Sequence, residues 1–410
     1  MTSTLFVFFD TQPVGQITID ARRRWRFQYD SSWLRAGTFP LSTRLPLREA
    51  PFEDDLSKPF FSNLLPEGKV RRLIAATKGQ SANNDFEMLA ALGGDCAGAI
   101  SVYPERELPP KKGKYREIGE EEMGRLIEEM PRRPLLLADG NARLSLAGAQ
   151  DKLPVFLEDN KIYLPEAGAP SSHILKPPIP DFEDTVFNEA FCMKLAGTFG
   201  IKVPRSEILL CQGKPIYLVL RYDRQWNEDK SIRRLHQEDF CQALGKYAEE
   251  KYQNEGGPSF SDCFRVLENF SVQPAVDKKQ LITWAVFNFL IGNCDAHGKN
   301  ISLLIAPDGI QLAPFYDLMS TAVYEGLSEK LAMKVGGKYK RREIFERHWE
   351  SFAAEADVKP RVVLEILKEL SKELPKYARS ECDRFTSHFG TRKILIKIVE
   401  EIQTAAKKFS

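Results

Sequence analysis

The chain has 410 residues, of which 43% are hydrophobic, so it is long enough to bury more than one core. Lys and Arg number 58 against 57 Asp and Glu, which excludes a global basic field that would attract nucleic acid or an anionic membrane. The seven cysteines form no CxxC pair, and no apolar run approaches the roughly 18 residues of a membrane span. Together with an N-terminus that does not resemble a signal peptide, these features predict reduced thiols and a cytoplasmic protein without membrane contact.

Residues 5–33 alternate apolar and polar side chains in short runs separated by turn formers, which predicts a small antiparallel sheet. The stretches FFSNLLPEGKVRRLIAATK and NNDFEMLAALGG carry apolar residues at three- and four-residue spacing and are expected to be helical. The following PERELPPKKGKYREIGEEE is rich in proline, glycine and charge. We therefore expect an N-terminal α+β domain over residues 1–105, followed by a linker and helix over residues 106–137.

Residues 144–220 are rich in β-branched and aromatic runs, and one helix is expected at NEAFCMKLAGTFG. The sequence after these runs is mostly helical, and its last segment has isoleucines at the spacing of a packing helix. The predicted fold class is α+β. A strand-rich lobe over residues 138–221 and a helical lobe over residues 222–410 are expected to follow the N-terminal domain.

The stretch WAVFNFLIGNCDAHGKN ends an apolar run with four polar side chains of different chemistry, Asp295, His297, Lys299 and Asn300. Two short strand-like runs follow, joined by Pro-Asp-Gly, and such a hairpin returns Asp317 to the segment that it left. Protein kinases have the same order of residues: an Asp that is the catalytic base, an Asn that is the second metal ligand, a hairpin, and then the metal-binding Asp. Each residue alone is more simply a turn cap or a strand end. The joint spacing favours Asp295 as the base, with Asn300 and Asp317 as ligands of Mg²⁺.

A phosphate-holding segment is predicted in SLAGAQDK, because its small residues allow backbone N–H groups to approach phosphate oxygens. The pattern alone is weak, since most such segments are ordinary turns. Lys176 lies in the apolar strand of SHILKPP and Glu189 in the next helix, the pairing that fixes a kinase lysine on the α- and β-phosphates. The alternative is a surface lysine with a buried stem. YLVLRYDR leads into the helical lobe and is the predicted hinge for adenine.

Seven stretches occur in the order seen in HipA-type serine/threonine kinases, the toxins of HipA–HipB toxin–antitoxin pairs. They are SLAGAQDK, HILKPP, VFNEAFCMKLA, LRYDRQW, HQEDFCQALG, NFLIGNCDAHGKN and PFYDLMS. FFSNLLPEGKVR and the sheet before it resemble the N-terminal domain of that family, so the resemblance extends from about residue 3 to beyond residue 390. It implies a bilobed protein-kinase-like fold, with Asp295 as the catalytic residue and Asn300 and Asp317 as the Mg²⁺ ligands.

The resemblance also implies an ATP site made by the phosphate loop, a strand lysine, the hinge and the catalytic loop. Its residues are Leu146, Ala147, Gly148, Ala149, Gln150, Asp151, Lys152, Lys176, Leu220, Tyr222, His297 and Lys299. Within this set His297 is expected to brace the loop. Ser145 matches the serine that family members phosphorylate on themselves. One departure is Leu220, which stands where the best-known member has an acidic residue; backbone groups hold adenine there, so a small effect is expected.

The expected function is that of an ATP- and Mg²⁺-dependent serine/threonine protein kinase toxin that arrests growth, as in persistence. The implied substrate is a translation-related protein, with an aminoacyl-tRNA synthetase as a candidate. The implied partner is a HipB-like DNA-binding antitoxin, and DNA would be contacted indirectly through it. Two alternatives stay open: a small-molecule or lipid kinase of related fold, and a nucleotide-binding pseudokinase that acts as a co-repressor.

Overall fold

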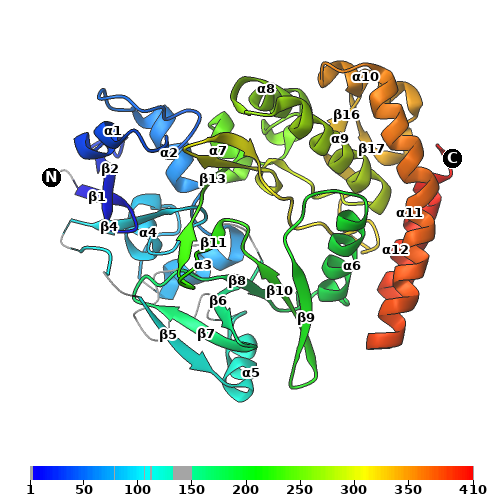
Figure 1. The fold of residues 1–410 in the computed structure, drawn as a ribbon, viewed down its shortest axis with the longest axis horizontal. Coiled ribbons are helices and arrows are strands. Elements are labelled where there is room, and N and C mark those ends of the chain that lie inside the picture. Colours follow the sequence, from blue (N-terminus) through cyan, green and yellow to red (C-terminus); the bar gives the residue numbers. More distant parts are fainter. Residues whose placement is uncertain (1–2, 78, 106, 111–112, 133–149, 410) are drawn as a thin grey trace. The chain divides into compact units, whose positions relative to one another are not determined.

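The computed structural model describes residues 3–77, 79–105, 107–110, 113–132 and 150–409 (Figure 1). The chain packs into two compact units, each assembled from three separate segments. Unit 1 comprises Met1–Pro177, Leu209–Ala248 and Leu303–Ile310. Unit 2 comprises Pro178–Ile208, Glu249–Ser302 and Gln311–Ser410. The chain therefore passes between the units repeatedly.

Unit 1 contains a four-stranded antiparallel sheet in the order β3-β2-β1-β4. Its strands are β1 (Ser3–Phe9), β2 (Gln12–Ile19), β3 (Trp25–Tyr29) and β4 (Ile100–Pro104). Trp25, Phe27 and Tyr29 are buried and the residues between them are exposed, as expected of a sheet with one covered face. The helices of this core are α1 (Ser31–Ala36), α2 (Asp54–Ser62), α3 (Gly68–Thr77) and α4 (Asp85–Leu92).

The predicted N-terminal sheet and helices are present, with one difference. The stretch expected as one helix is divided, because α2 ends at Ser62 and α3 begins at Gly68. Pro66 lies in the interval, lacks a backbone N–H and disfavours a helical conformation of the residue before it. The interval still contributes to the core, since Leu64 and Leu65 are buried.

A second sheet has six strands in the order β5-β7-β6-β8-β10-β9. They are β5 (Lys114–Ile118), β6 (Leu153–Glu158), β7 (Lys161–Glu166), β8 (His173–Lys176), β9 (Ser206–Cys211) and β10 (Lys214–Leu220). Helix α5 (Glu120–Glu129) covers it, and the buried residues form a core separate from that of the first sheet. The edge strand β5 comes from the segment expected to be a linker.

Smaller elements follow β10 in the chain. They are the hairpin of β11 (Arg224–Trp226) and β12 (Ile232–Arg234), helix α7 (Phe240–Leu244), and a sheet of β13 (His236–Asp239), β14 (Ser302–Ala306) and β15 (Gly309–Leu312). The strands β14 and β15 are the hairpin predicted after the polar loop. Ile305 of β14 belongs to the same core as the N-terminal sheet, so residues far apart in the sequence share one core.

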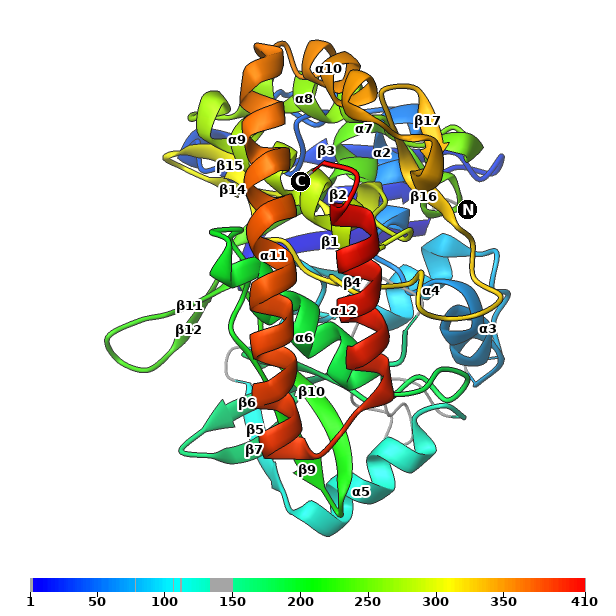
Figure 2. The same cartoon turned by 90° about the vertical axis from the view of Figure 1, so that its right-hand side faces the viewer.

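Unit 2 is mainly helical. Its helices are α6 (Thr185–Thr198), α8 (Phe260–Phe270), α9 (Pro274–Ile291), α10 (Glu346–Glu355), α11 (Pro360–Phe389) and α12 (Lys393–Ala406). Figure 2 shows α11 (orange) and α12 (red) side by side, and both pack against α6 and α9. Ile394, Ile398 and Ile402 of α12 are buried, as their spacing predicted, whereas Ile396 is exposed. A hairpin of β16 (Lys330–Val335) and β17 (Lys338–Lys340) interrupts the region predicted to be helical.

All seven cysteines lie in the described part of the chain, where they are buried and form no disulfide, as predicted. In the same residues, no helix is both long enough and apolar enough to cross a membrane.

Candidate active site

Helix α9 leads into the loop that carries most of the predicted site residues. It ends at Gly292, whose φ of +73° glycine adopts far more readily than other residues. A side chain at this position would also collide with Ala322, since an added Cβ would lie 2.8 Å from the Ala322 Cβ. The polar loop therefore begins at a fixed point directly after a rigid element.

The side chain of Asp295 is exposed, whereas its neighbours from residue 293 to residue 300 are buried. Its backbone N–H donates to Asn293 Oδ1 at 3.0 Å, and Asn293 Nδ2 donates to Asn288 Oδ1 at 2.8 Å. Asn288 in turn donates to the Trp284 carbonyl at 2.9 Å. This series of buried amides ties the loop to α9. The result is a single carboxylate presented to solvent by an otherwise closed loop.

Tyr252 is a further contact of this carboxylate and comes from a distant part of the chain. Its hydroxyl donates a hydrogen bond to Asp295 Oδ1. Its ring lies edge-to-face against the His297 imidazole, with the ring centroids 5.3 Å apart. Beside it, the Lys251 carbonyl accepts the Gly298 N–H at 3.3 Å. The His297 ring is thus part of the packing between the Tyr252 segment and the loop.

The β14–β15 hairpin brings the segments of Asn300 and Asp317 together. The Tyr316 hydroxyl donates to the Lys299 carbonyl at 2.6 Å. The same hydroxyl lies 2.8 Å from the Ser302 hydroxyl, within hydrogen-bond distance. The residue before Asp317 is therefore attached to the residue before Asn300, so the two predicted metal ligands stand on neighbouring stretches of backbone.

Asn300 and Asp317 offer an amide oxygen and a carboxylate, the hard donors that Mg²⁺ prefers. Asn300 Oδ1 accepts the His297 N–H at 3.2 Å, and an amide oxygen has a second lone pair for a cation. Asp317 is half-buried and has a φ of +56°, a left-handed conformation that costs a non-glycine residue roughly 1 to 3 kcal/mol. Such strain persists where the surroundings impose it, which is common at functional sites. The donor set fits Mg²⁺.

The backbone after Asp317 is fixed by α6 and by the polar loop. Asn188 of α6 is fully buried, and its amide donates to the Ser320 carbonyl at 2.9 Å while accepting the Ser320 N–H at 2.8 Å. Thr321 Oγ1 accepts the Cys294 N–H at 2.7 Å. These bonds supply the surroundings that hold Asp317 in its strained conformation.

The predicted phosphate-binding lysine lies in unit 1. Lys176 is the last residue of β8 and is 5% exposed, so it is not a surface lysine. Its Nζ lies 5.7 Å from the ring centroid of Tyr217, the residue paired with it on β10. Glu189 is buried on α6 in unit 2. The chain therefore buries a cation in one unit and a carboxylate in the other.

Part of the predicted phosphate loop precedes β6, where Gln150, Asp151 and Lys152 are half-buried. Burial raises the pKa of Asp151, and the positive charge of Lys69 opposes that rise. The remaining residues of this prediction lie outside the described residues; they are Ser145, Leu146, Ala147, Gly148 and Ala149.

The predicted hinge follows β10, which ends at Leu220, and the Tyr222 hydroxyl donates to Gln237 Oε1. Between these residues Arg221 is buried and bonds both Asp223 oxygens, at 2.9 and 2.7 Å. The hinge backbone is also bonded to the end of the preceding loop, since the Arg221 N–H donates to the Ser172 carbonyl at 2.9 Å.

Asp95, from the turn after α4, completes a buried ion network with this hinge. Its two oxygens lie 2.9 Å from Arg224 Nη2 and 3.3 Å from Arg221 Nη1. Burial raises the pKa of Asp95, but the positive charges of Arg224, Arg221 and Arg234 outweigh burial and hold the pKa below its ordinary value. Asp95 is therefore an anion that fixes the hinge from the N-terminal part of the chain.

Sequence reasoning missed Tyr252, Asn188 and Asp95, because each contacts the site across a long stretch of sequence. Two weak signals exist. The Gly256-Gly257 pair marks a tight fold just after Tyr252, and an asparagine within the apolar pattern of α6 requires a buried polar partner. Asp95 has no local signal.

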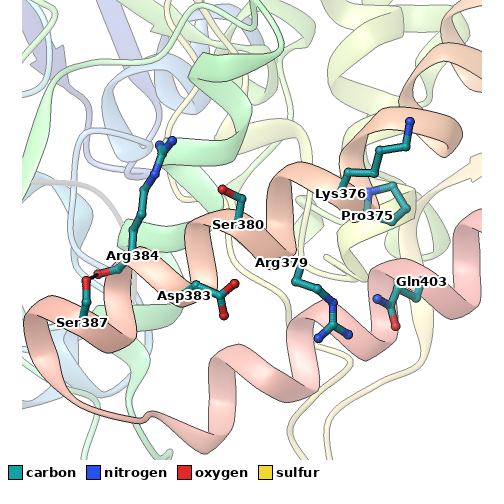
Figure 3. Close-up of a pocket in the computed structure, with 8 residues that line it drawn as sticks. All are labelled: Pro375, Lys376, Arg379, Ser380, Asp383, Arg384, Ser387 and Gln403. Atoms are coloured by element: carbon teal, nitrogen blue, oxygen red, sulfur yellow. Dashed lines mark hydrogen bonds between the residues drawn. The ribbon is translucent and has the colours of Figure 1, made fainter.

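A surface groove of unit 2 lies between α11 and α12 (Figure 3). It is lined by Pro375, Lys376, Arg379, Ser380, Asp383, Arg384, Ser387 and Gln403. Two of its cations have acidic neighbours on their own helix, since Lys376 pairs with Glu373 at 3.0 Å and Arg384 with Glu381 at 3.1 Å. The groove contains none of the predicted site residues and has the character of a solvated helical surface.

Two features are typical of kinase-like proteins. One is a buried lysine on a strand of a strand-rich unit. The other is the order Asp, Asn, hairpin, Asp in a helical unit. The family model of the HipA-like C-terminal domain matches residues 144–378. That of the HipA N-terminal domain matches residues 5–103. The chain belongs to the HipA family.

Individual relatives agree with this assignment. A protein named putative kinase Y4mE, from Sinorhizobium fredii, is 44% identical over 360 residues, which cover 86% of this chain and 86% of that protein. The serine/threonine-protein kinase toxin HipA of Shewanella oneidensis is 31% identical over 389 residues, covering 92% of this chain and 88% of the relative. The solved structure of Shewanella oneidensis HipA with HipB and its operator DNA has a TM-score of 0.86 at 28% identity, and covers 99% of this chain and 97% of that one. The predicted family and α+β kinase-like fold are confirmed.

Proposed function

We propose that this chain is an ATP- and Mg²⁺-dependent protein kinase that phosphorylates serine or threonine and acts as a HipA-type toxin. The observation that carries the proposal is the exposed Asp295 carboxylate in an otherwise buried loop, together with the oxygen donors Asn300 and Asp317 on neighbouring backbone. Relatives named as kinases support the same reaction. A solvated turn would not bury every residue around one exposed carboxylate.

In the proposed reaction Asp295 accepts the proton of the acceptor hydroxyl while the hydroxyl oxygen forms a bond to the γ-phosphorus. The bond between that phosphorus and its bridging oxygen breaks, and ADP leaves with the electron pair. Asn300 and Asp317 would hold Mg²⁺, which when bound neutralises charge on the phosphates. In unit 1, the Lys176 ammonium and the backbone N–H groups of Gln150, Asp151 and Lys152 would bind phosphate oxygens. Backbone of the segment from Leu220 to Tyr222 would meet adenine.

Self-inhibition by phosphorylation of Ser145 is part of the proposal. A phosphoserine adds about −1.5 to −2 of charge. Placed at the start of a loop that attracts phosphate, this charge would prevent the loop from closing on ATP. Ser145 lies outside the described residues, and its sequence context and membership of the family support its role.

The proposed partner is a HipB-like DNA-binding antitoxin, supported by the HipB and operator DNA in the solved structure of the Shewanella relative. The net charge of +1 favours contact with DNA through that partner over direct binding. The proposed substrate is a translation-related protein, with an aminoacyl-tRNA synthetase as the candidate, and the proposed outcome is growth arrest.

The test compares wild type with Asp295→Asn, using ATP labelled in the γ-phosphate, Mg²⁺ and bacterial lysate. Asp295→Asn should bind nucleotide normally and lose transfer to protein by about 10²- to 10⁴-fold, the usual effect of losing a general base. Asp308→Asn, on the exposed turn of the hairpin, is the matched control and should transfer like wild type. Intact mass after incubation with ATP should show one phosphate that Ser145→Ala lacks.

Near wild-type transfer by Asp295→Asn would refute the role of the base. Label that appears on a metabolite instead of a protein would favour a small-molecule or lipid kinase. Nucleotide binding without any turnover would favour a pseudokinase co-repressor.

A further inference from the structure

We infer that Tyr252 is a positioning residue for Asp295. Its hydroxyl holds the carboxylate through Oδ1 and leaves Oδ2 available to the acceptor hydroxyl. The inference rests on the proposed function, because it concerns the transfer in which Asp295 is the base. It adds to the catalytic machinery a residue that lies 43 positions before Asp295 in the chain.

The backbone hydrogen bond of Asp295 restricts the position of its Cα, but it does not set the direction of the carboxylate. An exposed aspartate exchanges among staggered rotamers, and only some of these point an oxygen toward a bound hydroxyl. A hydrogen bond from Tyr252 selects one orientation. Since the phenol is neutral, it leaves the negative charge on the carboxylate, which must stay anionic to accept a proton.

The position of Tyr252 is itself imposed by its surroundings. Its carbonyl accepts the Gly257 N–H at 3.0 Å, and a Cβ added at Gly257 would lie 2.0 Å from the Glu250 carbonyl oxygen. The next residue, Gln253, accepts the Lys334 N–H of β16 through its side chain at 2.7 Å. With its ring against His297, the tyrosine is supported by β16 on one side and by the catalytic loop on the other.

The proposed role of Tyr252 is to orient Asp295, and this role is separate from nucleotide binding. In the transfer the proton passes from the acceptor hydroxyl to Asp295 Oδ2, while Tyr252 keeps its own proton. Loss of the Tyr252 hydroxyl should therefore leave the affinity for nucleotide unchanged and lower the fraction of time that Asp295 is correctly oriented. The effect should appear in kcat and not in KM for ATP.

The experiment uses the full chain as wild type, Tyr252→Phe, Asp295→Asn and the double variant. Transfer of label from ATP to protein is measured together with the affinity for a fluorescent ADP. Tyr252→Phe should lower transfer by about 10- to 100-fold, as expected when a catalytic group is misplaced, and should change the ADP Kd less than about twofold. The double variant should be no slower than Asp295→Asn, because Tyr252 acts through Asp295.

Hydrogen exchange of the nucleotide-free protein gives a readout that does not depend on activity. Tyr252→Phe should speed exchange at the backbone amides of residues 293–298 and leave those of α9 unchanged. If wild type transfers no phosphate, the proposed function fails, and hydrogen exchange still reports whether Tyr252 holds the loop. Tyr339→Phe, a half-buried tyrosine on β17, is the matched control and should behave as wild type in both assays.

Three results would overturn the inference. The first is transfer by Tyr252→Phe within about twofold of wild type. The second is a double variant whose loss is the product of the two single losses, which indicates independent roles. The third is unchanged exchange in residues 293–298.

Discussion

Lys176 is a charged side chain on the inner part of a sheet, and its role can be separated from its packing. Lys176→Met keeps most of the apolar stem that lies beside Tyr217 and removes the ammonium. We expect the melting temperature to change by only a few degrees, whereas the affinity for ATP or ADP should fall by at least about tenfold, or about 1.4 kcal/mol. Thermal unfolding and nucleotide titration on the same samples measure the two effects.

Lys214→Met on β10 is the control for this substitution. Lys214 is exposed and pairs with Glu128 at 2.5 Å, so its loss should affect neither quantity much. Unchanged nucleotide affinity together with a large drop in melting temperature for Lys176→Met would make Lys176 a structural residue.

The proximity of site residues could be predicted where these residues lie close to one another in the chain. Asp295 and Asn300 share one loop, and Asp317 returns through a hairpin whose turn is marked by Pro-Asp-Gly. Tyr252 could not be assigned in this way, because only folding brings its hydroxyl to Asp295. Hydropathy and turn signals describe neighbours along the chain, and they carry no information about a hydrogen bond between distant segments.

At the scale of elements, α6 supports the loop that carries Asp317. Asn188→Ala removes the amide that satisfies both the N–H and the C=O of Ser320. Leaving these groups buried without this partner should lower the free energy of unfolding by about 1 to 3 kcal/mol. Because Ser320 lies just after Asp317, the variant should also lose the increase in ADP affinity that the proposed function predicts for wild type with Mg²⁺. Urea unfolding and ADP titration with and without Mg²⁺ measure the two effects.

Thr198→Ala, at the exposed end of the same helix, is the comparison for Asn188→Ala. It removes a side-chain hydrogen bond to the Lys194 carbonyl and should leave the Mg²⁺ effect intact. If Asn188→Ala loses stability but keeps the Mg²⁺ effect, Asn188 has a structural role and does not support the metal site.

Elements with strong local patterns were predicted, and elements that depend on a distant partner were not. The buried face of α12 followed from its isoleucine spacing. In contrast, β5 lies between proline-rich and charged residues, and its strand conformation depends on pairing with β7. The β16–β17 hairpin is short and its burial does not alternate cleanly, so it gave no period-two signal against the helical segments around it.

At the scale of the whole chain, unit 1 joins its N-terminal part to the segment after β10 through buried groups. Glu238 on β13 is fully buried, and its oxygens accept the Ser42 hydroxyl at 2.5 Å and the Thr43 N–H at 2.9 Å. Burial raises the pKa of Glu238 to about 7, and these hydrogen bonds offset part of the rise. On the same strand, burial lowers the pKa of His236 to about 4. Folding therefore favours the neutral form of both groups.

Glu238→Gln isolates the contribution of this carboxyl, because His236 is present in both proteins and cancels in the comparison. Below pH 4.5, the ordinary pKa of the group, Glu238 is protonated in the folded and unfolded chains and does not affect stability. As the pH rises from 4.5 to about 7, the unfolded chain loses this proton first, so wild type loses stability relative to Glu238→Gln. The variant should therefore gain up to roughly 3 kcal/mol relative to wild type by about pH 8, measured by urea unfolding across this range. Glu369→Gln, at an exposed position on α11, is the matched control. A pH-independent difference for Glu238→Gln would contradict the raised pKa.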